Sequence, residues 1–221
     1  MTDLQDDEIA LDPEVEGVTV ALRPLSEAPP PAPPLPPADG FRDDEWAVHL
    51  PDGQILAFLR EPVAHCHLDR IALVAGARRV ERPLPGWVYY PSHFAVGQRG
   101  LLIGGPRSGW RLDYDGTLTL LLDEPDGEGV NVAWRGDTAV LAGWRRTVLD
   151  GPGGRVELPC ANAVAACAVA GLAVISDDDG SMWIEGDRVI ARHWRPYREA
   201  RGDDVILSTA GDAYAVRVIR G

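Results

Sequence analysis

Three adjacent carboxylates at residues 177–179, in the stretch SDDDGSMW, are the side chains with the clearest potential for chemistry. Clustered carboxylate oxygens are ligands that Ca²⁺ prefers, and an EF-hand loop needs Gly at position 6, an oxygen ligand at position 1 and a bidentate Glu at position 12. With Gly180 at position 6, Ile175 takes position 1 and Gly186 takes position 12, so both key ligands are missing. We therefore predict that the aspartates form a hairpin turn, in which Asp binds backbone amides and Gly supplies a positive φ.

A second candidate for metal chemistry is HCHLD at residues 65–69. Side chains two residues apart on a strand face the same side, so His65 and His67 would lie about 6–7 Å apart, close enough to share one ion. Zinc needs a third and a fourth ligand, and the sequence does not place one. Two ordinary strand histidines are the simpler interpretation. We predict no metal and no cofactor, with His65 and His67 kept as metal candidates.

No GxSxG elbow, P-loop, HExxH or CxxC motif occurs, so we predict no catalytic residues. Tryptophan and arginine, the residue types that dominate interface energetics, are abundant. Packing between sheets accounts for most of the seven tryptophans. The residues that we select as a possible interaction surface are Trp110, Trp144, Arg145, Arg146 and Arg195.

From Phe41 onward, short β-favouring runs alternate with Gly and Asp turn signals, without a 3.6-residue periodicity. One apolar run recurs at steps of 30–38 residues, each time followed by a strand of alternating polarity; its copies are IALVAG (71–76), LLIGG (101–105), AVLAG (139–143), LAVIS (172–176) and VILST (205–209). Units of three or four strands at this spacing are typical of β-propeller blades. Since these runs are apolar throughout, we expect them nearest the propeller axis.

The repeat predicts an all-β fold, a compact β-propeller of five blades, with six as an open alternative and a two-sheet β-sandwich as the competing architecture. A hairpin at residues 45–60 precedes the first apolar run. It could complete the final blade together with DAYAVRVIRG (212–221), or belong to a sixth blade.

Four residues of the acidic stretch, Ser176, Asp178, Gly180 and Trp183, fit the spacing S-x-D-x-G-x-x-W. This pattern resembles the Asp-box hairpin of sialidase-like propellers. The resemblance implies a structural turn, in which the Asp caps turn amides and the Trp packs between blades. It covers eight residues and does not imply sialidase chemistry, because no arginine triad or Tyr/Glu nucleophile pair can be assigned.

The N-terminal 40 residues differ in composition from the rest. Residues 1–16 contain seven acidic and no basic residues, which is typical of a disordered or partner-ordered tail. GVTVALRP (17–24) has period two and predicts a strand, whose pairing with the sheets is open. Eight prolines between Pro24 and Pro37 predict a polyproline II spacer. We therefore divide the chain into an arm and linker (1–40) and a propeller domain (41–221), which we expect to fold without residues 1–37.

The chain has 34 acidic and 21 basic residues, for a net charge of −13, and all of the basic residues are arginines. Lysine-free composition with abundant Ala, Gly and Pro is typical of a GC-rich bacterial genome. The negative charge argues against nucleic acid and membranes as partners and allows a basic protein surface. Three cysteines, an acidic start without a signal-peptide pattern, and no apolar run of about 18–20 residues predict a cytoplasmic protein.

These features predict a non-enzymatic protein–protein interaction module, an adaptor or subunit of a bacterial multi-protein assembly. The alternatives are an immunity or antitoxin-like protein that binds a basic effector, and a propeller enzyme or ligand binder that acts at the central channel. VTVALRPLSEAPPPAPPLPPADG (18–40) followed by a Trp-punctuated domain resembles small bacterial β-propeller proteins encoded beside MoxR-type AAA ATPases and von Willebrand A-domain proteins in conflict systems. The resemblance implies that an AAA ATPase or a von Willebrand A module is the partner.

Overall fold

The computed structural model of the chain describes residues 10–11, 16–34, 36–39, 46–50, 53–59, 68–88, 94–208 and 213–220. These residues form five antiparallel sheets and one 3₁₀ turn, η2 (Leu25–Glu27), and they contain no α-helix. The predicted all-β propeller class is confirmed. The β-sandwich alternative is wrong, because five separate sheets are present instead of two.

Four of the sheets are meanders of strands that follow one another in the chain. The first sheet contains β3 (Trp46–His49), β4 (Ile55–Leu59), β5 (Leu68–Ala75) and β6 (Arg78–Val88). The second contains β7 (Phe94–Gly97), β8 (Gly100–Gly104), β9 (Ser108–Asp113) and β10 (Leu118–Asp123). The third contains β11 (Asn131–Arg135), β12 (Thr138–Ala142), β13 (Arg146–Gly151) and β14 (Gly154–Pro159). The fourth contains β15 (Ala165–Val169), β16 (Leu172–Asp177), β17 (Gly180–Glu185) and β18 (Arg188–His193), with the short strand β1 (Ala10–Leu11) at its edge.

The fifth sheet combines the two ends of the chain. It contains β19 (Tyr197–Arg201), β20 (Asp204–Ser208), β21 (Ala213–Arg220) and, as its fourth strand, β2 (Val18–Pro24). β2 pairs with β21 over its whole length, from Val18 opposite Arg220 to Pro24 opposite Tyr214. Residues 18–24, which we assigned to the arm, are therefore part of a sheet. The predicted hairpin at residues 45–60 supplies β3 and β4 of the first sheet instead of completing the last blade or starting a sixth.

The recurrent apolar runs occupy the second strand in four of the five sheets: β8, β12, β16 and β20. All six residues of β16 are buried, because its neighbours pair with both edges and adjoining sheets cover both faces. The main contacts between successive sheets involve the first strands, with β11 beside both β7 and β15. Our expectation that the apolar runs lie nearest the axis is therefore wrong by one strand. In the first sheet the run IALVAG falls in the third strand, β5, and β4 takes the second place.

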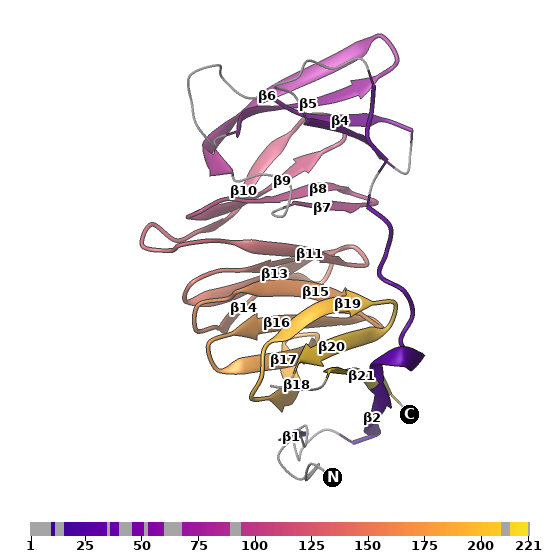
Figure 1. Cartoon of the computed structure of the whole chain (residues 1–221). Coiled ribbons are helices and arrows are strands. Elements are labelled where there is room, and N and C mark those ends of the chain that lie inside the picture. The colour runs from indigo at the N-terminus through magenta and orange to yellow at the C-terminus, as the bar shows by residue number, and fades with distance from the viewer. Residues whose placement is uncertain are drawn as a thin grey trace.

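Apolar clusters fill the space between consecutive sheets, which are stacked in chain order (Figure 1). In the second strands, alternate side chains pack into the apolar clusters on the two faces of the sheet. Leu101 and Ile103 of β8 pack with the first sheet, whereas Leu102 packs with the third. Because successive side chains of a strand point to opposite faces, one apolar strand contributes to two cores.

The proline-rich segment connects the fifth sheet to the first along one side of the stack (Figure 1). Pro24 and Ala28, on either side of η2, have φ/ψ angles of −55°/143° and −71°/147°, in the polyproline II region. At the other end, Pro37 bridges to Val48, and the His49 amide donates to the Pro36 carbonyl (2.9 Å).

Candidate functional site

The acidic stretch at residues 177–179 forms the hairpin between β16 and β17. Asp177 lies opposite Gly180, and Asp178 and Asp179 form the turn. The buried Asp177 carboxylate accepts hydrogen bonds from the amides of Asp179 (3.1 Å) and Ala161 (3.1 Å). We assigned the capping role to Asp178, and this is wrong by one residue: Asp178 is exposed, and its carboxylate accepts a hydrogen bond from Asn162 Nδ2 at 3.3 Å.

The other residues of the S-x-D-x-G-x-x-W pattern serve the packing of this hairpin. Ser176 is fully buried, and its hydroxyl oxygen accepts from the Tyr197 amide at the start of the fifth sheet (2.9 Å). Trp183 is fully buried in the cluster between the fourth and fifth sheets. Gly180 has a φ of +123°, and a Cβ there would lie 2.1 Å from the His193 carbonyl oxygen. The hairpin therefore fixes the position of the residues that follow β18.

The other predicted residues separate into buried, exposed and undescribed ones. Trp110 is 2% exposed in the cluster between the first and second sheets, so its assignment to an interaction surface is wrong. Trp110 lies on the buried face of β9, where Trp110 and Leu112 alternate with the less buried Arg111 and Asp113. Trp144 is half-buried and Arg145 exposed. His65 and His67 lie outside the described residues; within the described part of the chain, no group of three or more His, Cys, Asp or Glu side chains is arranged to hold a metal ion.

One side of the stack, which we term the loop face, carries Trp144, Arg145, Arg146 and Arg195. It consists of the hairpins between second and third strands and the connections from each fourth strand to the next sheet. Residues 160–164 show how these loops interlock: the Asn162 amide donates to the Trp144 carbonyl (2.6 Å), and the Asp178 amide donates to the Ala161 carbonyl (2.8 Å). This connection is thus tied to the hairpins of both the third and the fourth sheet.

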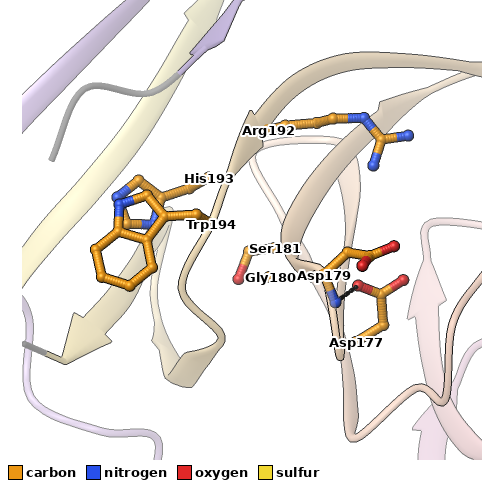
Figure 2. Close-up of a pocket in the computed structure, with 7 residues that line it drawn as sticks. All are labelled: Asp177, Asp179, Gly180, Ser181, Arg192, His193 and Trp194. Carbon is orange, nitrogen blue, oxygen red and sulfur yellow. Dashed lines mark hydrogen bonds between the residues drawn. The ribbon is translucent and has the colours of Figure 1, made fainter. Parts of the chain in front are cut away.

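One hollow in the loop face, which we term the first hollow, has a volume of about 290 Å³ and is lined by Asp177, Asp179, Gly180, Ser181, Arg192, His193 and Trp194. Trp194 and His193 lie on one side of it, and Asp177 and Asp179 on the other (Figure 2). The hollow therefore has an aromatic wall and an acidic wall, with a guanidinium group at its edge.

Trp194 is the most exposed large apolar side chain of the described residues, at 57%. The guanidinium carbon of Arg195 lies 4.1 Å from the centroid of its ring. The His193 ring also stacks on the indole, with a centroid separation of 5.9 Å and an interplanar angle of 23°. The Arg195 amide also donates to His193 Nδ1 (3.1 Å), which fixes the backbone between the three side chains. The indole is therefore both exposed and held in one orientation.

The second hollow, of about 320 Å³, lies between residues 123–127 and the hairpin that carries Trp144, Arg145 and Arg146. Its organising group is Glu124, which is 8% exposed. The Glu124 carboxylate accepts hydrogen bonds from three successive amides, those of Trp144, Arg145 (3.2 Å) and Arg146 (3.1 Å). Successive backbone N–H groups that converge on an anion form a nest. Glu124, which follows the last strand of the second sheet, therefore holds the β12–β13 hairpin of the third sheet in position.

Cys160 and Cys167 are poor nucleophiles. Burial, reinforced by the charge of Asp177, raises the pKa of the Cys160 thiol to about 12. Burial also raises the pKa of Cys167 to about 11, against a hydrogen bond from Tyr197 that lowers it. Since the thiolate is the reactive form, both side chains remain protonated and unreactive near neutral pH. What the loop face offers chemically is recognition by aromatic, guanidinium and carboxylate groups.

Comparisons with known proteins bear on the fold alone. No protein-family model and no curated protein sequence matches the chain. One similar solved structure, of a protein assigned as a gluconolactonase, is 14% identical, with a TM-score of 0.45, over 79% of this chain and 73% of that one. Another, BBS1N in complex with ARL6DN, is 10% identical, with a TM-score of 0.32, over 93% of this chain and 97% of that one. Likeness at this level transfers no activity, ligand or partner.

Sequence reasoning missed Trp194, His193 and Glu124 as site residues. Trp194 carried a weak signal, since it stands in the arginine-rich run RHWRPYR (192–198) directly after a strand. Glu124 carried no such signal, because its three amide donors belong to another sheet.

No helix among the described residues is long and apolar enough to cross a membrane.

Proposed function

We propose that the protein is a non-enzymatic interaction module that binds another protein through the loop face. The observation that carries the proposal is Trp194, an indole that is 57% exposed and in contact with both the Arg195 guanidinium group and the His193 ring. Leaving a large aromatic ring in water forfeits the free energy of burying it. Holding it in one orientation removes part of the entropy that a partner would otherwise have to overcome on binding.

The composition of the loop face supports a protein partner. Both hollows combine a tryptophan with arginines and carboxylates, and tryptophan and arginine are the residue types enriched among hot spots of protein–protein interfaces. Trp144 and Trp194 belong to neighbouring sheets, so one partner surface could contact both. Charged groups of both signs around each ring would fix the orientation of the partner.

On a wider scale, we propose that the protein is an adaptor or subunit of a bacterial multi-protein assembly. An AAA ATPase or a von Willebrand A module as the partner is supported by the sequence resemblance of residues 18–40 and the Trp-punctuated domain. The net charge of −13 supports a partner with basic groups on the surface that faces the acidic parts of this chain, whereas the arginines of the loop face would meet acidic groups of the partner.

The test is affinity capture from bacterial lysate with the intact chain and three single variants, Trp194→Ala, Trp144→Ala and Leu120→Ala. Leu120 is the control, because it is 52% exposed but lies within β10 instead of the loop face. We expect Trp194→Ala to reduce recovery of the specific partner by at least tenfold, as for a hot-spot residue, and Leu120→Ala to leave it unchanged. Equal recovery with all variants, each shown to be folded by circular dichroism, would contradict the proposal.

A further inference from the structure

The fourth sheet has an additional strand at its outer edge. Of the five sheets, only this one has a fifth strand among the described residues. Ala10 and Leu11 pair antiparallel with β18, opposite Arg192 and Ala191 respectively. β18 runs from Arg188 to His193, so β1 covers two of its six residues. The outer edge of β18 therefore accepts a strand from outside the sheet's own meander, and the described part of that strand is short.

The register directs a longer strand toward the first hollow. In an antiparallel pair, each residue that precedes Ala10 lies opposite a residue that follows Arg192, so an added strand would continue toward His193 and Trp194. Arg192 lines the hollow, and Trp194 forms its aromatic wall. The edge of β18 and the Trp194 site thus form one continuous surface, over which a single extended peptide could place its backbone on the edge and a side chain in the hollow.

The charges indicate what kind of peptide fits this edge. β18 carries Arg188 and Arg192, both exposed. The sequence around Ala10 and Leu11 is acidic, DLQDDEIALDPEVE at residues 3–16, with seven acidic residues and no basic ones. A strand that brings carboxylates beside exposed guanidinium groups gains attraction on top of its backbone hydrogen bonds.

We propose that the outer edge of β18 is a docking strand for an extended aliphatic peptide with acidic flanks, supplied by a partner protein, and that Ala10–Leu11 competes for this edge within the chain. The inference rests on the proposed function and names the chemistry of its partner segment. Binding would require displacement of β1, so that the apparent affinity depends on how often the edge is open. A tethered competitor acts at an effective concentration of about 1 mM.

The probe is a fluorescent peptide of residues 3–16, titrated into the full-length chain by anisotropy. The test variant is Ala10→Pro/Leu11→Pro, because two prolines remove whichever backbone N–H pairs with β18. We expect the double variant to bind the peptide about tenfold more tightly than the wild type, since the internal competitor is lost. Arg192→Glu in the double variant should weaken binding by at least tenfold. The same charge reversal at Arg107, an exposed residue in a hairpin of the second sheet, should leave peptide binding unchanged.

Equal peptide affinity for the wild type and the double variant, or no binding to either, would overturn the inference. Concentration-dependent dimerisation of the wild type in light scattering, abolished by the two prolines, would also overturn it, because the occupant would then be a second copy of the chain. These outcomes are independent of the proposed function. Partner capture that depends on Trp194 could persist when the peptide fails to bind, and peptide binding could persist when capture fails.

Discussion

The guanidinium group of Arg23, in β2, donates a hydrogen bond to the carboxylate of Asp204 in β20, 181 residues further along the chain. The other carboxylate oxygen accepts from Nε of Arg217 in β21 (2.9 Å). Asp204 itself has no exposed surface. The two ends of the chain are therefore joined by a buried ion network as well as by the backbone pairing of β2 with β21, and the fifth sheet is complete only with residues from the N-terminal segment.

Substitution of Asp204 by Asn should reduce the free energy of unfolding by about 2–3 kcal/mol, because two arginines then lose their buried counter-charge. The figure is below that for a fully buried pair, since the arginine side chains are about 30% exposed (30% and 32%). The neighbouring change Asp203→Asn is the control: Asp203 is 59% exposed and should contribute less than 1 kcal/mol. Urea denaturation of both variants measures the difference, and equal effects would show that burial of Asp204 is unimportant.

The same network predicts a dependence of stability on pH. Burial alone would raise the pKa of Asp204, but hydrogen bonds from Arg217 and Arg23 outweigh it, so the pKa lies below its ordinary value. A carboxyl group with a lowered folded-state pKa stabilises the fold above its unfolded pKa of about 3.9, and this contribution is lost as the pH falls. Between pH 5 and pH 2.5, wild-type stability should therefore fall more steeply than that of Asp204→Asn. Parallel curves would contradict the assignment.

Truncation should separate the two N-terminal strands. Deletion of residues 1–15 removes β1 and should change the melting temperature by less than 2 °C. Deletion of residues 1–37 also removes β2, whose residue Val18 packs with Val216 and Val218, and leaves Asp204 without Arg23. We expect a loss of at least 3 kcal/mol, or about 6–12 °C in a chain of this size. An unchanged melting temperature after the longer deletion would restore our expectation that the domain folds without the arm.

Glu124→Gln should destabilise the chain by about 2 kcal/mol, because the amide side chain keeps one acceptor oxygen for three converging N–H donors and loses the charge. The same substitution at Glu157, an exposed partner of Arg155 (side chain 40% exposed), should change stability by less than 0.5 kcal/mol. Thermal denaturation distinguishes the two. In hydrogen exchange, the amides of Trp144, Arg145 and Arg146 should lose protection in Glu124→Gln alone.

The cysteines provide a chemical readout of the packing between the third, fourth and fifth sheets. With pKa values of about 12 for Cys160 and about 11 for Cys167, the thiolate fraction at pH 8 is far below that of an ordinary thiol with a pKa of about 8.5. In a Cys66→Ser chain, reaction with Ellman's reagent at pH 8 should be at least 100-fold slower than in guanidinium chloride. Fast reaction of either thiol in the folded chain would show that these sheets do not pack as described.

The sequence predicted the elements whose signals are local. Alternating and apolar runs located the second strands, and Asp and Gly located the hairpin at residues 177–180. Signals that depend on distant partners were lost. Nothing in the first 24 residues indicates that β2 pairs with β21, and the run IALVAG is as apolar in a third strand as in a second. Trp110 and Trp194 look alike in sequence, and only the packing of the first sheet over β9 makes one buried and the other exposed.

The most direct test of the account is site-specific photo-crosslinking on the loop face. A photoreactive phenylalanine analogue replaces Asp179, an exposed residue at the rim of the first hollow, or Leu120 in β10. We predict a covalent adduct with one partner protein from position 179, lost when Trp194→Ala is added, and no such adduct from position 120. Adduct formation from position 120, or formation from position 179 that is unaffected by Trp194→Ala, would contradict the loop face as the binding surface.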